Sequence, residues 1–266
     1  MCLCLYMKDI GILKKHKFII FGNGHFNTLG MVRSLGEVGI RPDVVLVYDY
    51  QELDLVTSSK YIHDVHVADS IEEGLNYIIS VYSKEIEKPF LLTGSDKIIA
   101  VIDRNYNRLI DKFYFFNAGE EGRINKLLSK KNQNILAESC GFNVPKYEEV
   151  RIGAKPTIVP YPLITKAIDS TVNEWKHQVF LCRNESELQD AYSHLKGERI
   201  LLQQYIGKKN ETGFDALSVN DGKETYMPLQ LSYYDMTATS FGDYIFFFEP
   251  KDDELCARIK ELMRRN

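Results

Sequence analysis

Apolar and polar positions alternate along the first half of the chain in a way that predicts strands and helices in turn. An apolar run over residues 17–21 ends at Gly22, and residues 29–38 then repeat apolar side chains at helical spacing before Gly39, a typical helix end. The other predicted strands are Asp43–Val47, His63–Val67, Phe90–Leu92 and Phe113–Phe116, and the other predicted helices are Ile71–Tyr82 and Lys97–Leu109. This alternation predicts an α/β fold with a parallel sheet covered by helices on both faces.

The second half of the chain is predicted to be mixed. A helix that opens at Ser129 ends at Gly141, with Pro145 following four residues later. Residues 146–160 contain Pro and Gly and are predicted to run along the surface. The other predicted elements are strands over residues 161–166, 178–182 and 199–204, a helix Glu185–Leu195, antiparallel strands Thr212–Ser218, Thr225–Tyr233 and Asp243–Phe248, and a last helix Asp252–Arg265.

Composition and charge fit a soluble chain of more than one domain. The 266 residues are 44% hydrophobic and 26% charged, and domains average roughly 150 residues. The net charge of −4 is spread along the chain without a dense Lys or Arg stretch, which argues against a nucleic-acid partner. The apolar residues 1–7 are too few to cross a membrane. Five scattered cysteines without the spacing of a zinc site or a disulfide framework predict reduced thiols and a cytoplasmic protein.

Two loops after predicted strands are candidates for a ligand crevice, because ligands of parallel α/β sheets bind beyond the carboxyl ends of the strands. These loops are Gly22–His25 and Thr93–Asp96. We therefore take His25 and Asp96 as candidate substrate-binding residues. Each has an alternative: acids such as Asp96 are common at helix starts, and His25 can be structural or solvent-facing.

The glycines of the first loop only weakly match a dinucleotide-binding fingerprint. Gly22 and Gly24 have the right spacing, but the third glycine is expected at position 27, where the chain has Asn27, and comes instead at Gly30. A tight turn requires the same glycines. A nicotinamide-dependent enzyme therefore stays open as a rival hypothesis.

Two short segments predict a nucleotide pocket. Tyr161-Pro-Leu-Ile-Thr-Lys166 is an apolar, β-favouring run that ends with a lysine, and a lysine at the end of a rigid strand is a fixed point charge for a phosphate. Leu201-Leu-Gln-Gln-Tyr-Ile206 is an apolar strand that turns polar just before Gly207. The alternatives are a solvated lysine and an ordinary strand edge.

The order of these motifs resembles the ATP-grasp superfamily. It runs from Ser129-Lys through an amphipathic helix, Gly-x-x-x-Pro145, the strand ending at Lys166, a polar loop and a Glu185-Ser-Glu-Leu helix to Gln-Gln-Tyr-Ile206. Each motif is degenerate, so the specificity lies in their order and spacing. The resemblance covers the chain from about Phe18 to its last residue. It implies a pre-ATP-grasp parallel α/β domain (residues 1–119), an N-terminal ATP-grasp lobe (120–205) and an incomplete C-terminal lobe (206–266).

The resemblance implies which side chains hold the phosphates of ATP. Lys166 is one, and a lysine at the start of the preceding helix is the other, for which counting gives Lys130 rather than Lys131. The loop after Lys166 lacks the glycines that family members generally use to wrap phosphates with backbone N–H groups. Side chains such as Ser170 and Lys176 are expected to take their place.

The resemblance also implies how adenine is recognised. The carbonyl of Gln204 accepts a hydrogen bond from the adenine amino group, and the N–H of Ile206 donates one to a ring nitrogen. Gln203 and Glu211 are then candidates for the amino-group and ribose contacts.

The activity that the resemblance implies is an ATP-dependent ligation of a small-molecule carboxylate to an amine through an acyl-phosphate. In the family the Mg²⁺ ligands, an acidic residue and a later Glu-x-Asn, follow a helix that residues 252–265 resemble, so we assign no metal ligand and no catalytic base to the sequence. We expect a piece of a longer ligase. The alternative is a non-catalytic nucleotide-binding protein, a pseudoenzyme or sensor.

A narrower resemblance concerns Ser170, Trp175-Lys176 and Lys208–Glu211. These residues resemble bacterial carboxylate–amine ligases that are often encoded with surface-polysaccharide genes, which suggests a role in that biosynthesis. The apolar side chains of the last predicted helix lack a covering strand in the sequence. An exposed apolar face favours association, so a homo-oligomer is a further expectation.

Overall fold

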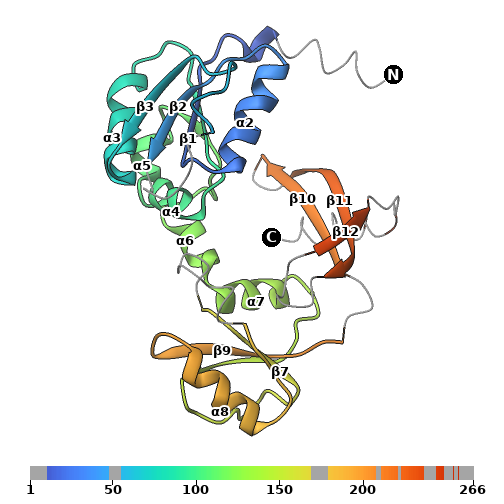
Figure 1. Ribbon diagram of the computed structural model, residues 1–266. Coiled ribbons are helices and arrows are strands. Elements are labelled where there is room, and N and C mark those ends of the chain that lie inside the picture. The colour runs from blue at the N-terminus through green and yellow to red at the C-terminus, as the bar shows by residue number, and fades with distance from the viewer. Residues whose placement is uncertain are drawn as a thin grey trace. The chain divides into compact units, whose positions relative to one another are not determined.

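The computed structural model describes residues 11–47, 55–168, 179–207, 211–220, 223–236 and 244–248, together with Glu254 and Ala257. Its internal contacts divide the chain into two compact units, residues 1–126 and 127–266. Unit 1 contains one sheet and unit 2 contains two (Figure 1). Within the described residues, no helix has the length and apolar character needed to cross a membrane.

Unit 1 is a five-stranded parallel sheet with helices on both faces, which confirms the predicted fold class. The strand order is β3-β2-β1-β4-β5. The strands are β1 (Phe18–Gly22), β2 (Asp43–Val47), β3 (Asp64–Ala68), β4 (Phe90–Leu92) and β5 (Tyr114–Phe115), and the helices are α2 (Phe26–Glu37), α3 (Ile71–Tyr82), α4 (Asp96–Arg104) and α5 (Tyr106–Leu109). Apolar runs this continuous are typical of strands buried on both faces.

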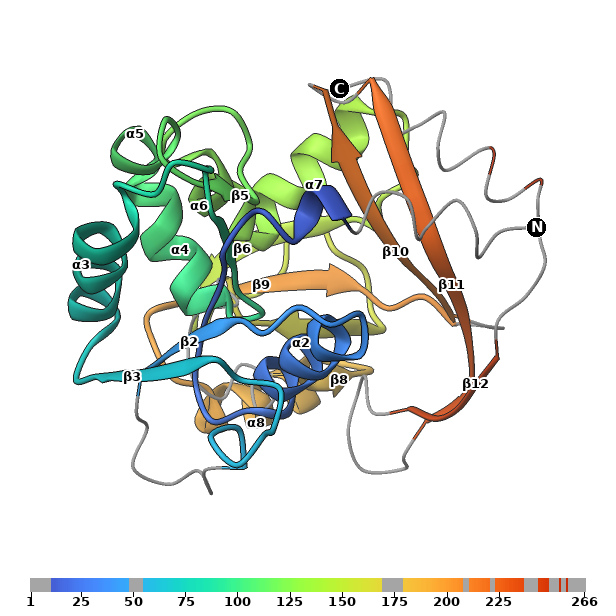
Figure 2. The same cartoon turned by 90° about the horizontal axis from the view of Figure 1, so that it is seen from above.

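The two faces of this sheet have separate cores. Phe21 of β1 is fully buried in a cluster with Leu75 of α3 and Ile98 of α4. Ile20, the preceding residue of β1, points to the other face and lies in a cluster with Val32 of α2. Figure 2 shows α2 on one side of the strands and α3 and α4 on the other. Alternate residues of β1 therefore hold the three layers together.

One helix prediction in unit 1 is wrong. Residues 97–109 were expected to form one helix, but α4 ends at Arg104 and α5 begins at Tyr106. Asn105 interrupts them, and its side-chain amide donates a 2.9 Å hydrogen bond to the carbonyl of Val101. A short polar side chain that bonds the backbone in this way competes with helical hydrogen bonding.

A buried carboxylate fixes the start of α6 (Arg123–Leu128), a helix that the sequence did not predict. Asp103 of α4 is only 2% exposed. Its carboxylate accepts hydrogen bonds from the backbone N–H groups of Ile124 (3.2 Å) and Asn125 (2.9 Å) and from the side-chain amide of Asn125 (2.6 Å). These donors compensate the cost of burying a charge.

The first sheet of unit 2 is antiparallel and lies between two helices. Its order is β6-β9-β7-β8, with β6 (Tyr147–Arg151), β7 (Leu163–Lys166), β8 (Leu181–Cys182) and β9 (Arg199–Gln204). Helix α8 (Glu185–His194) buries Leu188 against Leu163 and Leu202 on one face. Helix α7 (Lys130–Ser139) lies on the other face, where Tyr147 donates a 3.4 Å hydrogen bond to Glu138. Figure 1 shows the two helices on opposite sides of β7 and β9.

Strand β6 corrects the prediction that residues 146–160 run along the surface. The segment begins with a strand paired along its whole length with β9. Only Val150 of β6 is buried, and glutamate is depleted in strands. Because of Glu148 and Glu149, the sequence pattern therefore did not predict this strand. Both glutamates are used: Glu148 binds the loop that follows β6, and Glu149 binds Arg199 and Lys131.

The second sheet of unit 2 is also antiparallel, as predicted. It consists of β10 (Glu211–Val219), β11 (Glu224–Met236) and β12 (Tyr244–Phe248) in that order. The turn after β10 contains Asn220 with a φ of 53°, a left-handed conformation that asparagine tolerates better than most residues. The predicted last helix over residues 252–265 lies outside the described residues except for Glu254 and Ala257, which are helical.

Two helical glycines of unit 1 should respond oppositely to alanine. At Gly74 of α3 a methyl group would lie 2.7 Å from Cε2 of the buried Phe21 ring, whereas at Gly30 of α2 nothing lies within 4 Å. We expect Gly30→Ala to stabilise by up to about 1 kcal/mol through helix propensity. We expect Gly74→Ala to destabilise by roughly 1–3 kcal/mol through overpacking. Chemical denaturation of both variants measures this, and a stabilised Gly74→Ala protein would show that the core has room for the methyl group.

Acid should weaken the attachment of the loop after β6. The Glu148 carboxylate accepts hydrogen bonds from the N–H groups of Thr157 (2.9 Å), Ile158 (2.8 Å) and Val159 (2.9 Å). Burial alone would raise the pKa of Glu148, but these bonds outweigh it and hold the pKa below its ordinary value of 4.5. A depressed folded-state pKa gives stability that is present above pH 4.5 and is lost as the pH falls through the lower folded value.

Glu148→Gln should therefore unfold more easily than the wild type at pH 7, by about 1 kcal/mol after allowance for solvent screening. The difference should shrink in acid as Glu148 becomes protonated in the wild type. Denaturant unfolding at pH 7 and at pH 3 measures it. A difference of the same size at both pH values would count against an ionised Glu148 as the anchor.

Candidate functional site

Unit 1 has a topological switch point between β1 and β4, where the strand order reverses. Strands β1 and β4 are parallel neighbours, while the chain winds outward to β2 and β3 on one side and to β5 on the other. Such switch points are where open α/β sheets bind ligands. The loop after β4 lies close to the start of α2, the helix that follows the first loop, since a Cβ atom on Gly94 would lie 3.3 Å from the Cβ of Asn27. The structure thus brings the two predicted loops to one edge of the sheet.

The two candidate substrate residues each begin a helix there. His25 is the N-cap of α2: its Nδ1 accepts a 3.2 Å hydrogen bond from the N–H of Asn27, and its ring lies against that of Phe26. Asp96 is the exposed first residue of α4, and the cap is the preceding Ser95, whose hydroxyl accepts from the N–H of Ile98 at 3.5 Å. His25 thus has a structural use, and Asp96 remains available at the surface.

Gly22 is explained by a close approach of helix and strand. A Cβ atom there would lie 2.4 Å from Oγ1 and 2.9 Å from Cγ2 of Thr28, which is 2% exposed. Only glycine lets α2 lie this close to the end of β1. This observation favours the structural interpretation of the first loop.

In unit 2, the pairing of β7 with β9 brings the two predicted nucleotide segments together. Lys166 is the cross-strand partner of Leu201, and Ile164 is the partner of Gln203. Directly opposed residues, and residues two apart on one strand, share a face of the sheet. Lys166 and Gln203 therefore lie on the same face, about 7 Å apart along the strand direction.

Helix α7 begins next to the end of β7. The backbone N–H of Lys130 donates a 2.9 Å hydrogen bond to the carbonyl of Ile168, two residues beyond Lys166. The Lys130 ammonium donates to the side-chain carbonyl of Gln133 at 3.3 Å. Lys131, the alternative phosphate residue, instead forms an ion pair with Glu149 at 3.5 Å. Lys130 and Lys166 thus belong to one region of unit 2.

The segment after β9 offers backbone groups of the kind that adenine needs. The N–H of Gln204 donates to the carbonyl of Lys146 at 2.8 Å, and that of Tyr205 donates to the carbonyl of Pro162 at 3.0 Å. The next residue, Ile206, is 48% exposed, and among the described residues its N–H donates to no backbone carbonyl. Gln203 is 7% exposed. Within the described part of the chain, the backbone is held up to Tyr205 and the N–H of Ile206 is without a backbone partner.

Several predicted residues cannot be placed. Ser170 and Lys176 lie outside the described residues. Glu211 is the first residue of β10, paired with Tyr233, and its side chain is not described. Among the described residues there is no group of three or more His, Cys, Asp or Glu side chains able to hold a metal ion, so we assign no residue to Mg²⁺.

Sequence reasoning missed two residues beside Lys130. Gln133 accepts from Lys130 and also donates a 2.7 Å hydrogen bond to the carbonyl of Leu127, which ties the lysine to the end of the preceding helix, α6. Asn134, one turn after Lys130, has a buried Nδ2 without a hydrogen-bond partner among the described residues. Their spacing of three and four residues from Lys130 is the signal that could have identified them.

Comparison with known proteins gives matches in three dimensions. No family model matches the chain, and no curated protein matches it in sequence. It is similar to the L-amino acid ligase from Bacillus licheniformis, with a TM-score of 0.69 and 12% identity over 94% of this chain and 59% of that protein. It is also similar to the N5-carboxyaminoimidazole synthetase from Staphylococcus aureus, with a TM-score of 0.64 and 15% identity over 94% of this chain and 62% of that one.

A third match is the D-alanine–D-alanine ligase from Bacillus anthracis, with a TM-score of 0.56 and 12% identity over 94% of this chain and 76% of that one. The chain thus spans about three fifths of the length of the first two proteins. At these identities the likeness concerns the fold. The chain therefore shares the fold of these proteins, which agrees with the ATP-grasp fold that the sequence resembles.

Proposed function

We propose that the protein binds ATP on the face of the first unit 2 sheet that carries Lys166 and Gln203, as part of an ATP-dependent ligase that joins a carboxylate to an amine. The observation that carries this proposal is that the start of α7 meets the end of β7, on the sheet face where the neighbouring strand β9 places Gln203. One solved neighbour, the Staphylococcus aureus synthetase, is known in complex with ADP.

Phosphates and adenine would bind at different ends of the ladder between β7 and β9. Lys166 is at the carboxyl end of β7, while Gln204 is opposite Leu163 at the beginning of that strand. Lys130 and Lys166 would bind the phosphates as fixed cations. The carbonyl of Gln204 and the N–H of Ile206 would bind adenine, and an extended nucleotide has the length to reach both ends.

The proposed reaction has two steps. A carboxylate oxygen attacks the γ-phosphorus of ATP, the bond to the β,γ-bridging oxygen breaks, and ADP leaves. The amine nitrogen then attacks the acyl carbon, phosphate leaves, and the amine loses a proton to solvent. The lysines would act by position and charge in both steps, and no described residue is assigned as a proton carrier.

The finer details stay predictions from the sequence. They include the roles of His25 and Asp96 in substrate binding, of Ser170, Lys176 and Glu211 in nucleotide binding, and of Mg²⁺, as well as the cytoplasmic location, the homo-oligomer and the part in surface-polysaccharide biosynthesis. The division at residues 119 and 205 is likewise proposed.

Replacement of Lys166 should test the nucleotide site directly. Loss of a charge-assisted contact to phosphate costs about 1.5–3 kcal/mol, so Lys166→Met should weaken ATP binding roughly 10- to 100-fold. The matched control is Lys155→Met in the same unit, since Lys155 is bound to Glu185 at the surface and should leave the affinity unchanged. Isothermal titration calorimetry with ATP and Mg²⁺ gives both constants.

Equal affinities of the two variants and the wild type would contradict the proposed site. The reaction itself is tested by ADP formation with panels of carboxylates and amines. ATP binding without ADP formation from any pair would favour the non-catalytic nucleotide-binding alternative. Saturable binding of NADH in a fluorescence titration would instead favour the nicotinamide-dependent rival.

A further inference from the structure

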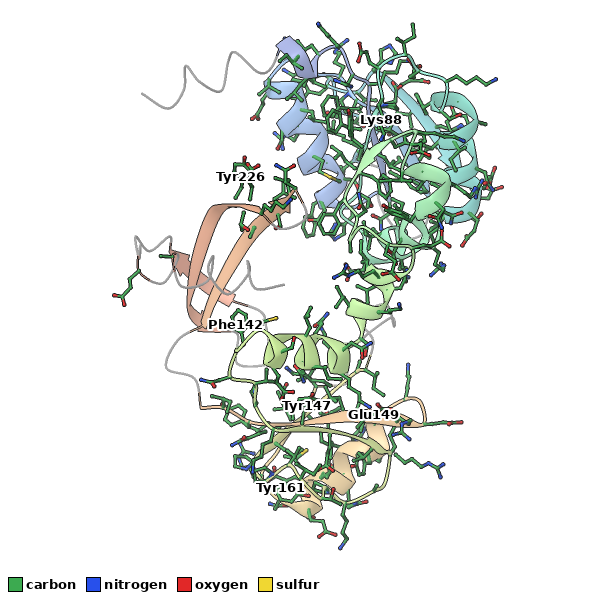
Figure 3. The ribbon with its side chains drawn as sticks, turned by 180° about the vertical axis from the view of Figure 1, so that it is seen from behind. Lys88, Phe142, Tyr147, Glu149, Tyr161 and Tyr226 are labelled. Atoms are coloured by element: carbon green, nitrogen blue, oxygen red, sulfur yellow. The ribbon has the colours of Figure 1, made fainter. Side chains whose placement is uncertain are left out.

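We infer that Glu149 is a positioning residue for the phosphate site: by binding Lys131 it fixes the start of α7 so that Lys130, and not Lys131, serves the nucleotide. This inference rests on the proposed function and adds a residue that neither the sequence motifs nor the fold assigned. Figure 3 shows Tyr147 between the sheet and α7, and the ion pair with Lys131 of α7 places Glu149 on the same face.

Glu149 connects three elements through one carboxylate. It belongs to β6, and its Oε1 accepts a hydrogen bond from Nε of Arg199, the first residue of β9. Its Oε2 is 3.5 Å from the ammonium of Lys131 on α7. The Glu149 side chain is 20% exposed, against 49% for Lys131. The helix is therefore attached to β6 and to β9, and β9 is one of the two strands on which the site depends.

The register places Glu149 in line with Lys166. Glu149 is the cross-strand partner of Leu201 on β9, and Leu201 is in turn the partner of Lys166 on β7. Directly opposed residues share a face, so Glu149, Leu201 and Lys166 form one row, about 10 Å long. The start of α7 extends along this row, because Lys131 is bound at Glu149 and the backbone of Lys130 is bound at Ile168, beyond Lys166.

The charges around Lys130 and Lys131 give the two lysines different roles. The hydrogen bond from Arg199 is the largest influence on Glu149 and, against the effect of burial, it and the attraction of Lys131 hold the pKa of Glu149 below its ordinary value. Glu149 is thus an anion at neutral pH, and Lys131 is its counter-ion. The Lys130 ammonium is bound to the neutral amide of Gln133. An anionic phosphate displaces a neutral amide from a lysine at lower cost than it displaces a carboxylate.

The adjacent Glu148 provides a matched control. It points to the opposite face, where it holds residues 157–159, so Glu148→Gln makes the same chemical change without touching α7. If Glu149 mattered only for the stability of the sheet, the two substitutions would affect nucleotide binding alike. If it positions α7, only Glu149→Gln should weaken ATP binding.

The experiment measures ATP affinity by calorimetry, and unfolding midpoints in parallel, for Glu149→Gln, Lys131→Met, the double variant, Lys131→Arg and Glu148→Gln. We expect Glu149→Gln and Lys131→Met to weaken ATP binding equally, about fivefold to tenfold, and the double variant to be no weaker, because the residues act as a pair. Lys131→Arg should stay within about twofold of the wild type, since arginine still binds a carboxylate. Glu148→Gln should also stay within about twofold, whatever its midpoint.

Three results would overturn the inference. The first is unchanged affinity in Glu149→Gln and Lys131→Met. The second is a much larger loss in Lys131→Met than in Glu149→Gln, which would make Lys131 itself the phosphate residue. The third is a loss in Glu148→Gln equal to that in Glu149→Gln. Lys166→Met distinguishes failure of this inference from failure of the proposed function. If Lys166→Met binds ATP as well as the wild type does, or if the wild type binds none, the site is misassigned. The inference then fails with the proposed function.

Discussion

The pairing of β9 with its two neighbours is the constraint on which the rest of unit 2 depends. As an inner strand of its sheet, β9 fixes β6 on one side and β7 on the other. Its register decides that Gln203 shares a face with Lys166 and that the chain past Gln204 continues beside the start of β7. A nucleotide site assembled from separate strands needs such a ladder, because neither strand positions the other's side chains alone.

The fold of unit 1 could be predicted because its strands carry local signals. The strands of a parallel sheet are buried on both faces and read as apolar runs, and Asp43–Val47 and Ile71–Tyr82 have the bounds expected of them. The failures have non-local or side-chain causes. The break at Asn105 comes from an amide bound to the backbone, and α6 depends on Asp103, twenty residues earlier in the chain.

The candidate site was only partly predictable from sequence. A lysine that ends an apolar strand is visible in the sequence, as is a strand whose end turns polar, so Lys166 and the segment after Gln204 could be named. Spacing gives Lys130 as the phosphate residue at the start of α7, but it does not show what makes Lys130 and not Lys131 available. The answer depends on Glu149, which lies in a strand that the sequence pattern did not predict because of its glutamates. The partners of Glu149, Lys131 and Arg199, are distant from it in the chain.

The adjacent glutamates of β6 also determine the alignment of this strand. Its apolar pattern is weak, since Val150 is its one buried residue. Among the described strands, β6 is paired with β9 alone. A slip by one residue would turn every side chain to the other face. Glu149 would then face the Leu188 core without Arg199, and Glu148 would lose the loop N–H groups that it binds. The hydrogen bonds and ion pairs of the two glutamates thus favour one register for this edge strand, a role that apolar side chains have in other strands.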